Sequence, residues 1–442
     1  MHFSVYLSAA FLIVLFGYLI LRTYHYRLDL SEDRVYGLSP QSIQVLEALR
    51  SEPVHVYGFF KEDQGTKTIL ENLLKEYAYR HPKFHYEFYD PDRMPAKVKQ
   101  FGVDAYGTIV IEAKGRHEKT TQVTEEAITN LLARLHRQET KRIVFATGYG
   151  GPPLEEETKP DGYGLLRKKL IDFNYEVRES FLARDKISRG TDLVVIAGPH
   201  VDLLPAELDI VKTYLERGGN LLVLMDPVQA GEGKNLQKFL QGYGIRLGED
   251  VVVDKLSKLF GADYLIPLVT EYKPHPITRG FRLASFFPVA RSVRKNSDVP
   301  KDFEVVEFAW TGVGSWAETN LKDLSEGKAE FDAKHDEKGP LPVAAAVTTV
   351  GEPSRLVVFG DSDFVTNHHL NLSGNRDLFF NAVAWLAGDE FAIAIRPRLR
   401  KVTPLYLTER DQKLLFYVSV LGFPLSFLLG GTFLFFWRRQ YR

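Results

Sequence analysis

The sequence predicts an α/β protein held at a membrane by an apolar segment at each end. Residues 3–21 and 414–437 are uncharged, apolar and about long enough to cross a bilayer as helices. Between them, short strand-like runs alternate with amphipathic helical runs. From residue 141 onward the strand-like runs are apolar at nearly every position, which is typical of parallel strands covered on both faces.

Length and composition limit the class of protein. The 442 residues can form two or more domains, and 45% apolar with 26% charged residues is a globular balance. The formal net charge of −1 and the lack of a long basic run give no indication of a nucleic-acid partner. The chain has no cysteine, which excludes disulfides, zinc–cysteine sites, iron–sulfur clusters and cysteine nucleophiles. We expect neither a metal site nor a cofactor.

A short helix is predicted between the first apolar segment and the first strand. Ser39 is a helix cap, and Pro40 suits the first helical position because its missing N–H costs nothing there. Apolar residues then recur on one helical face, at Ile43, Leu46 and Leu49.

The first domain is expected over residues 29–140. A strand at 54–60, a helix at 66–81 with Ile69, Leu73, Leu74 and Tyr77 on its apolar face, and a strand at 84–90 are followed by a hairpin around Lys114–Gly115 and a helix at 125–137. This order resembles the thioredoxin-like one, so we expect the strands 54–60 and 85–89 to lie in one sheet. Without a CxxC motif, the domain is interpreted as a scaffold or docking module.

The second domain is expected over residues 141–392, as a flavodoxin-like or amidotransferase-like α/β domain with a mostly parallel sheet. Its four apolar runs are KRIVFATGYG, TDLVVIAGPH, GNLLVLMDP and SRLVVFGDSD. An insertion with strands of its own and a mobile charged loop is predicted at about 260–340. A basic linker, 393–413, leads into the second span.

The polar residues that follow these strands form a candidate ligand site: Gly198, His200, Asp226, Asp361 and Asp363. Ligands of open parallel sheets bind beyond the carboxyl ends of the strands, so we expect Gly148, Gly198, Asp226 and Asp361 along one sheet edge. The alternative, which we favour, is that glycines make the turns while aspartates cap the next helices.

No catalytic residue is assigned. Ser362 stands in Gly-Asp-Ser-Asp-Phe, where Phe364 replaces the second glycine that a nucleophile elbow needs. His368 and His369 would point about 100° apart on a helix, so Asn367–His369 is interpreted as a surface turn. The sequence contains no Walker A motif, so any ATP hydrolysis would belong to another subunit.

Several segments together resemble the GldG-like auxiliary components of uncharacterised, gliding-motility type ABC transport systems. They are DLSEDRVYGLSPQSIQVLEAL, PVHVYGF, IAGPHVDLLPAELDIVKTYLERGGNLLVLMDP, HPITRGF, VVFGDSDFVTN and NRDLFFNAVAWLAGDE, which extend from Asp29 to Glu390. The resemblance implies a membrane-anchored, extracytoplasmic partner of an ABC-type permease and ATPase, described as a substrate-binding-like component. It brings no catalytic residues.

We therefore expect a non-enzymatic accessory subunit of an ABC-type transport system in the cytoplasmic (inner) membrane, with self-association left open. The alternative is an extracytoplasmic ligand-binding receptor or hydrolase that uses the cleft near Asp226 and Asp361. Basic residues after the second span favour cytoplasmic tails, at Arg438, Arg439 and Arg442. Basic residues on the domain side of the spans favour the opposite topology, at Arg22, Arg27, Arg410 and Lys413.

Overall fold

The structure is a computed structural model that describes residues 15, 16, 18, 37–61, 65–136, 140–227, 233–255, 257, 263–351, 354–389 and 416–440. The linker predicted at 393–413, and all but three residues of the span predicted at 3–21, lie outside the described residues.

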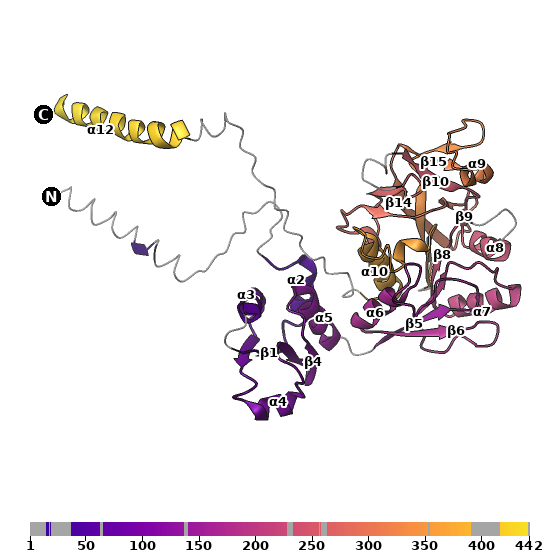
Figure 1. Ribbon diagram of the computed structural model, residues 1–442, viewed down its shortest axis with the longest axis horizontal. Helices are drawn as coiled ribbons and strands as arrows, with labels where there is room; N and C mark the ends of the chain where they lie inside the picture. The colour runs from indigo at the N-terminus through magenta and orange to yellow at the C-terminus, as the bar shows by residue number, and fades with distance from the viewer. Residues whose placement is uncertain are drawn as a thin grey trace. The chain divides into compact units, whose positions relative to one another are not determined.

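The first domain consists of one mixed sheet with helices on both faces (Figure 1). Its elements are α2 (Pro40–Ala48), β1 (Val54–Phe59), α3 (Gly65–Arg80), β2 (Phe84–Tyr89), α4 (Pro95–Phe101), β3 (Thr108–Ala113), β4 (Arg116–Thr120) and α5 (Glu125–His136). The strand order is β2-β1-β3-β4. β1 pairs in parallel with β2 and antiparallel with β3, so the predicted pairing of 54–60 with 85–89 is confirmed.

Helix α2 begins as the sequence predicts. The Ser39 hydroxyl accepts a hydrogen bond from the Ser42 backbone N–H, and Pro40 occupies the first turn. The apolar face predicted for α3 is confirmed at Leu74 and Tyr77, which are fully buried, but Ile69 is 59% exposed and Leu70 is buried in its place. Leucine and isoleucine doublets leave the helical phase ambiguous, and the sheet beneath the helix decides it.

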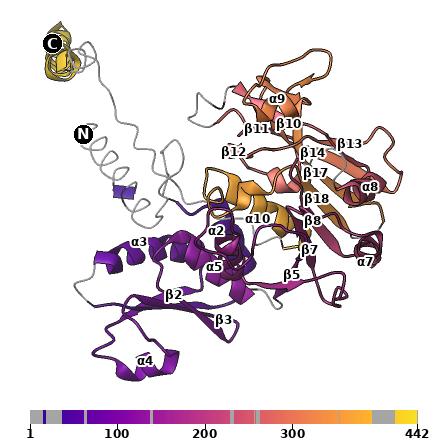
Figure 2. The same ribbon diagram turned by 45° about the vertical axis from the view of Figure 1, so that its right-hand side comes forward.

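The two faces of the first sheet are covered to different extents. Helices α2, α3 and α5 pack on one face through a large apolar cluster (Figure 2). On the other face α4 contributes a small cluster around Phe59, Phe101 and Val110. His55 and Tyr57 on β1 belong to this second face, which is only partly covered.

The second domain contains a nine-stranded sheet in the order β12-β11-β14-β17-β18-β8-β7-β5-β6. The first part of its chain forms β5 (Lys141–Ala146), α6 (Gly164–Asp172), β6 (Tyr175–Ser180), β7 (Leu193–Ala197), α7 (Pro205–Glu216), β8 (Asn220–Leu224) and α8 (Lys234–Gly242). The later elements of this sheet and its helix are β11 (Leu268–Tyr272), β12 (Ser285–Phe286), β14 (Phe303–Thr311), β17 (Pro342–Thr349), β18 (Arg355–Phe359) and α10 (Asn375–Leu386).

The sheet is parallel in one half only, which corrects the prediction of a mostly parallel sheet. β6, β5, β7, β8 and β18 run parallel; numbered along the chain, these strands lie in the order 2-1-3-4-5. β17, β14, β11 and β12 continue it with antiparallel pairs. The predicted insertion therefore extends the central sheet, because β11, β12 and β14 come from within it.

Five short strands, two just before the predicted insertion and three within it, lie outside the central sheet. β10 (Val251–Asp254), β15 (Ser315–Glu318) and β16 (Glu337–Lys338) form a small sheet, and β9 (Ile245–Leu247) pairs with β13 (Val293–Lys295). The short helix α9 (Leu321–Ser325) follows β15. These strands lie outside the central sheet but contribute to its core, because Val252 and Ala317 belong to one of its apolar clusters and Leu247 and Val293 to the other.

The apolar core lies on both faces of the parallel half, as continuous apolar strands require. Alternate residues of β8 belong to apolar clusters on opposite faces of the sheet. Leu222 and Leu224 face α6 and α10, whereas Leu221 and Val223 face α7 and α8. All four leucine and valine side chains are fully buried.

The second apolar segment is helical. The five residues Val418–Gly422 form a π-helical stretch that leads into α12 (Phe423–Gln440). Among the described residues it is the one helix long and apolar enough to cross a membrane, and none of its apolar window is buried. The π-type bond from Phe423 N–H to the Val418 carbonyl adjoins Pro424, whose ring would obstruct a regular helix.

Candidate functional site

Four strand ends meet at one edge of the sheet, as predicted. β5, β7, β8 and β18 are parallel neighbours, and the chain leaves them toward Gly148, Gly198, Asp226 and Asp361. β5 and β7 lie side by side although β6 separates them in the chain, so the connections diverge between them. Such a reversal of strand order is where open α/β sheets form ligand clefts.

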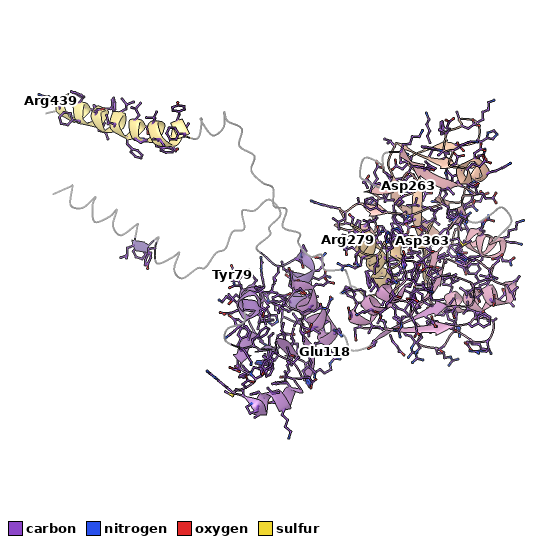
Figure 3. All side chains as sticks on the ribbon, in the orientation of Figure 1. Tyr79, Glu118, Asp263, Arg279, Asp363 and Arg439 are labelled. Carbon is purple, nitrogen blue, oxygen red and sulfur yellow. The ribbon has the colours of Figure 1, made fainter. Side chains whose placement is uncertain are left out.

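A cleft of about 410 Å³ lies at this edge. Its lining residues come from the loops after the four strands and from the insertion: Gly150, Gly151, Pro152, Pro153, Asp161, His200, Asp226, Pro227, Pro288, Val289, Ser362 and Asp363. Figure 3 labels Asp363 in the α/β domain. Of the five predicted site residues, His200, Asp226 and Asp363 line the cleft; Gly198 and Asp361 do not.

Asp226 and Ser362 form a direct pair across the cleft floor. The Ser362 hydroxyl donates to Asp226 Oδ2 at 2.7 Å, and the Ser362 backbone N–H donates to Oδ1. The serine proton is therefore held by a carboxylate. In the described part of the chain no histidine hydrogen-bonds to Ser362, so the histidine base of common serine hydrolases has no counterpart among these contacts.

Asp361 has the capping role that we favoured. Its side chain is fully buried, and its two oxygens accept from the backbone N–H groups of Asp363 at 2.7 Å and Phe364 at 3.1 Å. This carboxylate starts the 3₁₀ turn η3 (Asp363–Val365).

Close backbone packing explains two of the glycines. A Cβ atom on Gly151 would lie 2.1 Å from the Ala197 carbonyl oxygen. Gly198 has φ +51°, and a Cβ there would lie 2.6 Å from Ser362 Oγ and 3.3 Å from Asp226 Oδ2. Glycine is thus required for the β5 and β7 loops to approach each other and the Asp226–Ser362 pair.

Asn367 holds the loop that forms one wall of the cleft. Its Nδ2 donates to the carbonyls of Glu156 at 2.7 Å and Lys159 at 2.8 Å, and its Oδ1 accepts from Leu165 N–H at 2.9 Å. The chain does turn here, as predicted, but Asn367 is half-buried and fastens a loop about two hundred residues earlier in the sequence. His368 is the exposed residue of the turn.

Burial raises the pKa values of all three neighbouring carboxyls. For Asp226 and Asp363 desolvation is the largest cause. Burial raises the pKa of Asp361 well above its usual range, and the negative charges of Asp226 and Asp363 add to the effect. A raised carboxyl pKa means that ionisation costs folding stability, so this contribution is present at low pH and is lost as pH rises through the folded-state pKa.

A buried arginine, Arg291, bonds to the backbone beside the cleft. The Arg291 side chain is fully buried; its Nε donates to the Gly248 carbonyl at 2.8 Å and its Nη1 to the Asp226 carbonyl at 3.2 Å. Desolvation lowers the pKa of Arg291, and nearby acids, Asp250 first among them, oppose this. Arg291 thus positions the backbone of Asp226 and leaves its carboxylate to Ser362.

Among the lining residues that the predicted site did not include are Asp161, Pro288 and Val289. Asp161 stands in a loop without periodicity, and Pro288 and Val289 belong to the insertion. Val289 has φ +55° and is 41% exposed. A β-branched residue in the left-handed region is strained. Pro288 was the one feature of this part of the sequence that indicates a constrained turn.

The lining side chains offer hydrogen-bond acceptors and negative charge. Lysine and arginine do not occur in the lining, which has three aspartates and one exposed histidine. Within the described ranges, no group of three or more histidine, aspartate and glutamate residues is arranged to hold a metal ion. These groups suit the binding of a small ligand that is rich in hydrogen-bond donors.

The described contacts of the HPITRGF segment, residues 275–281, stabilise a turn and its packing. His275 Nδ1 accepts from Ile277 N–H at 3.2 Å and so caps the 3₁₀ turn η2 (Pro276–Thr278). The His275 ring packs against Phe308 and Trp385 with centroid distances of 5.6 and 4.7 Å. Desolvation first, and the charge of Arg355 second, lower the pKa of His275 to about 4.

Comparison with known proteins yields two family matches. The model described as ABC-type uncharacterized transport system matches residues 140–384, which is more than half of the chain. A domain of unknown function (DUF7088) matches residues 32–145.

Two curated relatives are intraflagellar transport protein 52 homologs. The mouse protein is 32% identical over 103 residues, which cover 22% of this chain and 23% of that protein. The human protein is 32% identical over 101 residues, or 22% of each chain. The matched part thus spans less than a quarter of either relative.

Among solved structures, the mmIFT52 N-terminal domain has 22% identity and a TM-score of 0.41, covering 55% of this chain and 97% of that one. A putative ThuA-like protein from Bacteroides uniformis has 14% identity and a TM-score of 0.33, covering 56% and 90%.

Proposed function

This chain belongs to the family described as ABC-type uncharacterized transport system, and from that premise we propose that it is a membrane-anchored, non-enzymatic, substrate-binding-like accessory subunit of such a system. The family match carries the accessory role. Its partners would be an ABC-type permease and an ATPase. The absence of a Walker A motif in the sequence agrees with ATP hydrolysis by another subunit.

The two soluble domains suit a docking role. The first has the strand and helix order of a thioredoxin-like domain, in a chain without cysteine, which favours a scaffold over redox chemistry. The parallel strands of the second have the 2-1-3-4-5 order of flavodoxin-like sheets. Both assignments rest on topology.

The anchor is α12, which presents apolar side chains on all sides. Phe427 is 77% exposed and Phe433 is 69% exposed, as expected for a helix that faces lipid or another helix. A Cβ atom added at Gly430 or Gly431 would point into open space, with no atom within 4 Å apart from the neighbouring backbone of the same helix. Small residues let membrane helices approach closely, so this is the surface we assign to the permease.

Replacing Gly430 and Gly431 together by leucine should abolish co-purification of the permease from native membranes, while the variant stays in the membrane fraction. Added side chains would hold a neighbouring helix away. The control is Leu428→Ile with Leu429→Ile on the same helix, which preserves apolar volume and should retain the partner. Normal co-purification of the leucine variant would contradict the assigned surface.

For topology we propose cytoplasmic tails and extracytoplasmic domains in the inner membrane. Arg439, labelled in Figure 3, follows the apolar part of α12. Protease added to intact spheroplasts should cut the exposed segment at 328–338 and spare the C-terminal tail. Protection of that segment until the membrane is opened would instead place the domains in the cytoplasm.

The cleft supports a second candidate function, an extracytoplasmic receptor for a small ligand. Its place at the reversal of strand order and its three aspartates favour ligands that donate hydrogen bonds or carry positive charge. The hydrolase version of this alternative would need an activated Ser362, whose hydroxyl donates to the Asp226 carboxylate and not to the histidine that commonly serves as the base.

We expect purified full-length protein to hydrolyse neither ATP nor esters, because a phosphate loop and a serine base are both lacking. Turnover is to be measured for the natural chain and for Ser362→Ala. The control is Ser325→Ala, at an exposed position on α9 outside the cleft. Activity that persists in the control and disappears in Ser362→Ala would establish the hydrolase instead.

A further inference from the structure

One edge of the first sheet, strand β2, lacks the features that usually prevent strands from pairing with another chain. β2 has the sequence FHYEFY, with one carboxylate in six residues and no proline or lysine. The opposite edge, β4, reads RHEKT, and the long edge of the second sheet, β6, reads YEVRES. Charges along an edge discourage pairing, and β12, the remaining edge of that sheet, has only two residues.

The backbone of β2 has alternate groups directed outward. The Val54 N–H bonds to the Lys83 carbonyl, and the Phe60 N–H bonds to the Tyr89 carbonyl. Because parallel ladders use every second residue, the odd-numbered residues of β2 face β1. Tyr86 and Phe88 therefore direct their N–H and C=O groups away from the sheet, and no described strand pairs with that side.

We propose that two copies of this chain associate through β2, antiparallel across a twofold axis at Tyr86, so that the two four-stranded sheets become one. This register places His85 opposite Glu87 of the partner subunit and Phe84 opposite Phe88 of the partner subunit. An interface of this kind is self-complementary, as twofold symmetry requires.

Strand length and charge favour this register over its neighbours. Only registers that bring outward-directed residues opposite each other can form the ladder, so the alternatives differ by two residues. One of them places His85 opposite the partner's His85, and the other places Glu87 opposite the partner's Glu87. The first alternative pairs only residues 84–86 of β2 with one another, whereas the Tyr86-centred register pairs residues 84–88. The second alternative is destabilised by two carboxylates directly opposite each other, whereas the Tyr86-centred register places each Glu87 opposite an imidazole.

The side chains fit this arrangement. His85 and Glu87 are exposed and lie on the face away from α3. They would form non-hydrogen-bonded pairs, in which side chains are closest. Tyr89 Oη donates to Glu87 Oε2, which holds this carboxylate in place. Tyr86 and Phe88 are half-buried against the helical face and would be covered by the partner's aromatic side chains.

A cysteine-free chain makes the test direct, because every disulfide comes from an introduced residue. Full-length copies with different tags, one His85→Cys and one Glu87→Cys, are co-expressed and oxidised in membranes. Opposite residues of a non-hydrogen-bonded pair have Cα atoms about 4.5 Å apart, within disulfide range. The expected result is a cross-linked dimer carrying both tags.

Each variant expressed alone is the matched control and should stay uncross-linked, since its two cysteines would lie two residues apart along the strands. A His85→Cys homodimer cross-link would overturn the Tyr86-centred register. Absence of any cross-link, or a cross-link to a different protein, would overturn self-association through β2.

A charge exchange provides a second readout. His85→Glu places carboxylates opposite each other and should weaken self-association in detergent about tenfold, from two cross-strand pairs turned repulsive. Mixing His85→Glu with Glu87→Lys copies restores opposite charges in both pairs and should recover the natural affinity in the mixed dimer. Equal affinity for all combinations would contradict the proposed contacts.

Discussion

Replacing Asn367 with aspartate is expected to destabilise the α/β domain by about 3–5 kcal/mol, more than replacing it with alanine. The two side chains have the same shape. Aspartate keeps the acceptor for Leu165 N–H but turns an oxygen toward the carbonyls of Glu156 and Lys159, at the positions now bonded at 2.7 and 2.8 Å. Alanine loses these bonds without adding repulsion and should cost about 2–3 kcal/mol.

The measurement is the free energy of unfolding by denaturant, with hydrogen exchange of residues 156–165. Exchange in this loop should accelerate in both variants. The control is His368→Ala at the exposed neighbouring position, where we expect a change within about 0.5 kcal/mol. If Asn367→Asp were as stable as the natural chain, the loop would be held by contacts other than this amide.

Replacing Gly151 with alanine is expected to cost about 3 kcal/mol or more and to displace the β5 loop from the β7 loop. The new Cβ would lie 2.1 Å from the Ala197 carbonyl oxygen and 3.2 Å from that of Gly198, and backbone atoms cannot move aside as a flexible side chain can. Denaturant unfolding measures the cost.

Gly312→Ala is the matched control, because a Cβ there would meet no atom within 4 Å. Its stability should be nearly unchanged. Equal stability of the Gly151 and Gly312 variants would show that the β5 and β7 loops lie farther apart than in the structure.

The convergence of strand ends could be predicted because it depends on local patterns. Uninterrupted apolar runs ending in glycine or aspartate identify parallel strands, and parallel strands direct their carboxyl ends to one edge. This placed Gly198, Asp226 and Asp361 correctly. The capping role of Asp361 could be predicted in the same way, because the short side chain of an aspartate after a strand can accept hydrogen bonds from the backbone N–H groups of the next turn.

The antiparallel half of the sheet could not be predicted, because its strands pair with residues distant in the chain. β14 pairs with β17, and β17 joins β18 at the border of the parallel half. Nothing local in residues 303–311 distinguishes a strand of the central sheet from one of a separate insertion. The contacts of Asn367 and Arg291 could not be predicted for the same reason, because their partners lie far away in sequence.

The position of β18 has a consequence for biosynthesis. This strand lies between β8 and β17 and joins the two halves of the sheet, yet it leaves the ribosome long after β8. At about 5–20 residues per second, the delay is on the order of ten seconds. During that time β8 lacks one neighbour, and the fully buried leucines of its core remain without their final partners. Folding of the α/β domain is thus delayed until synthesis is nearly complete, and during that time the unfinished domain is accessible to chaperones.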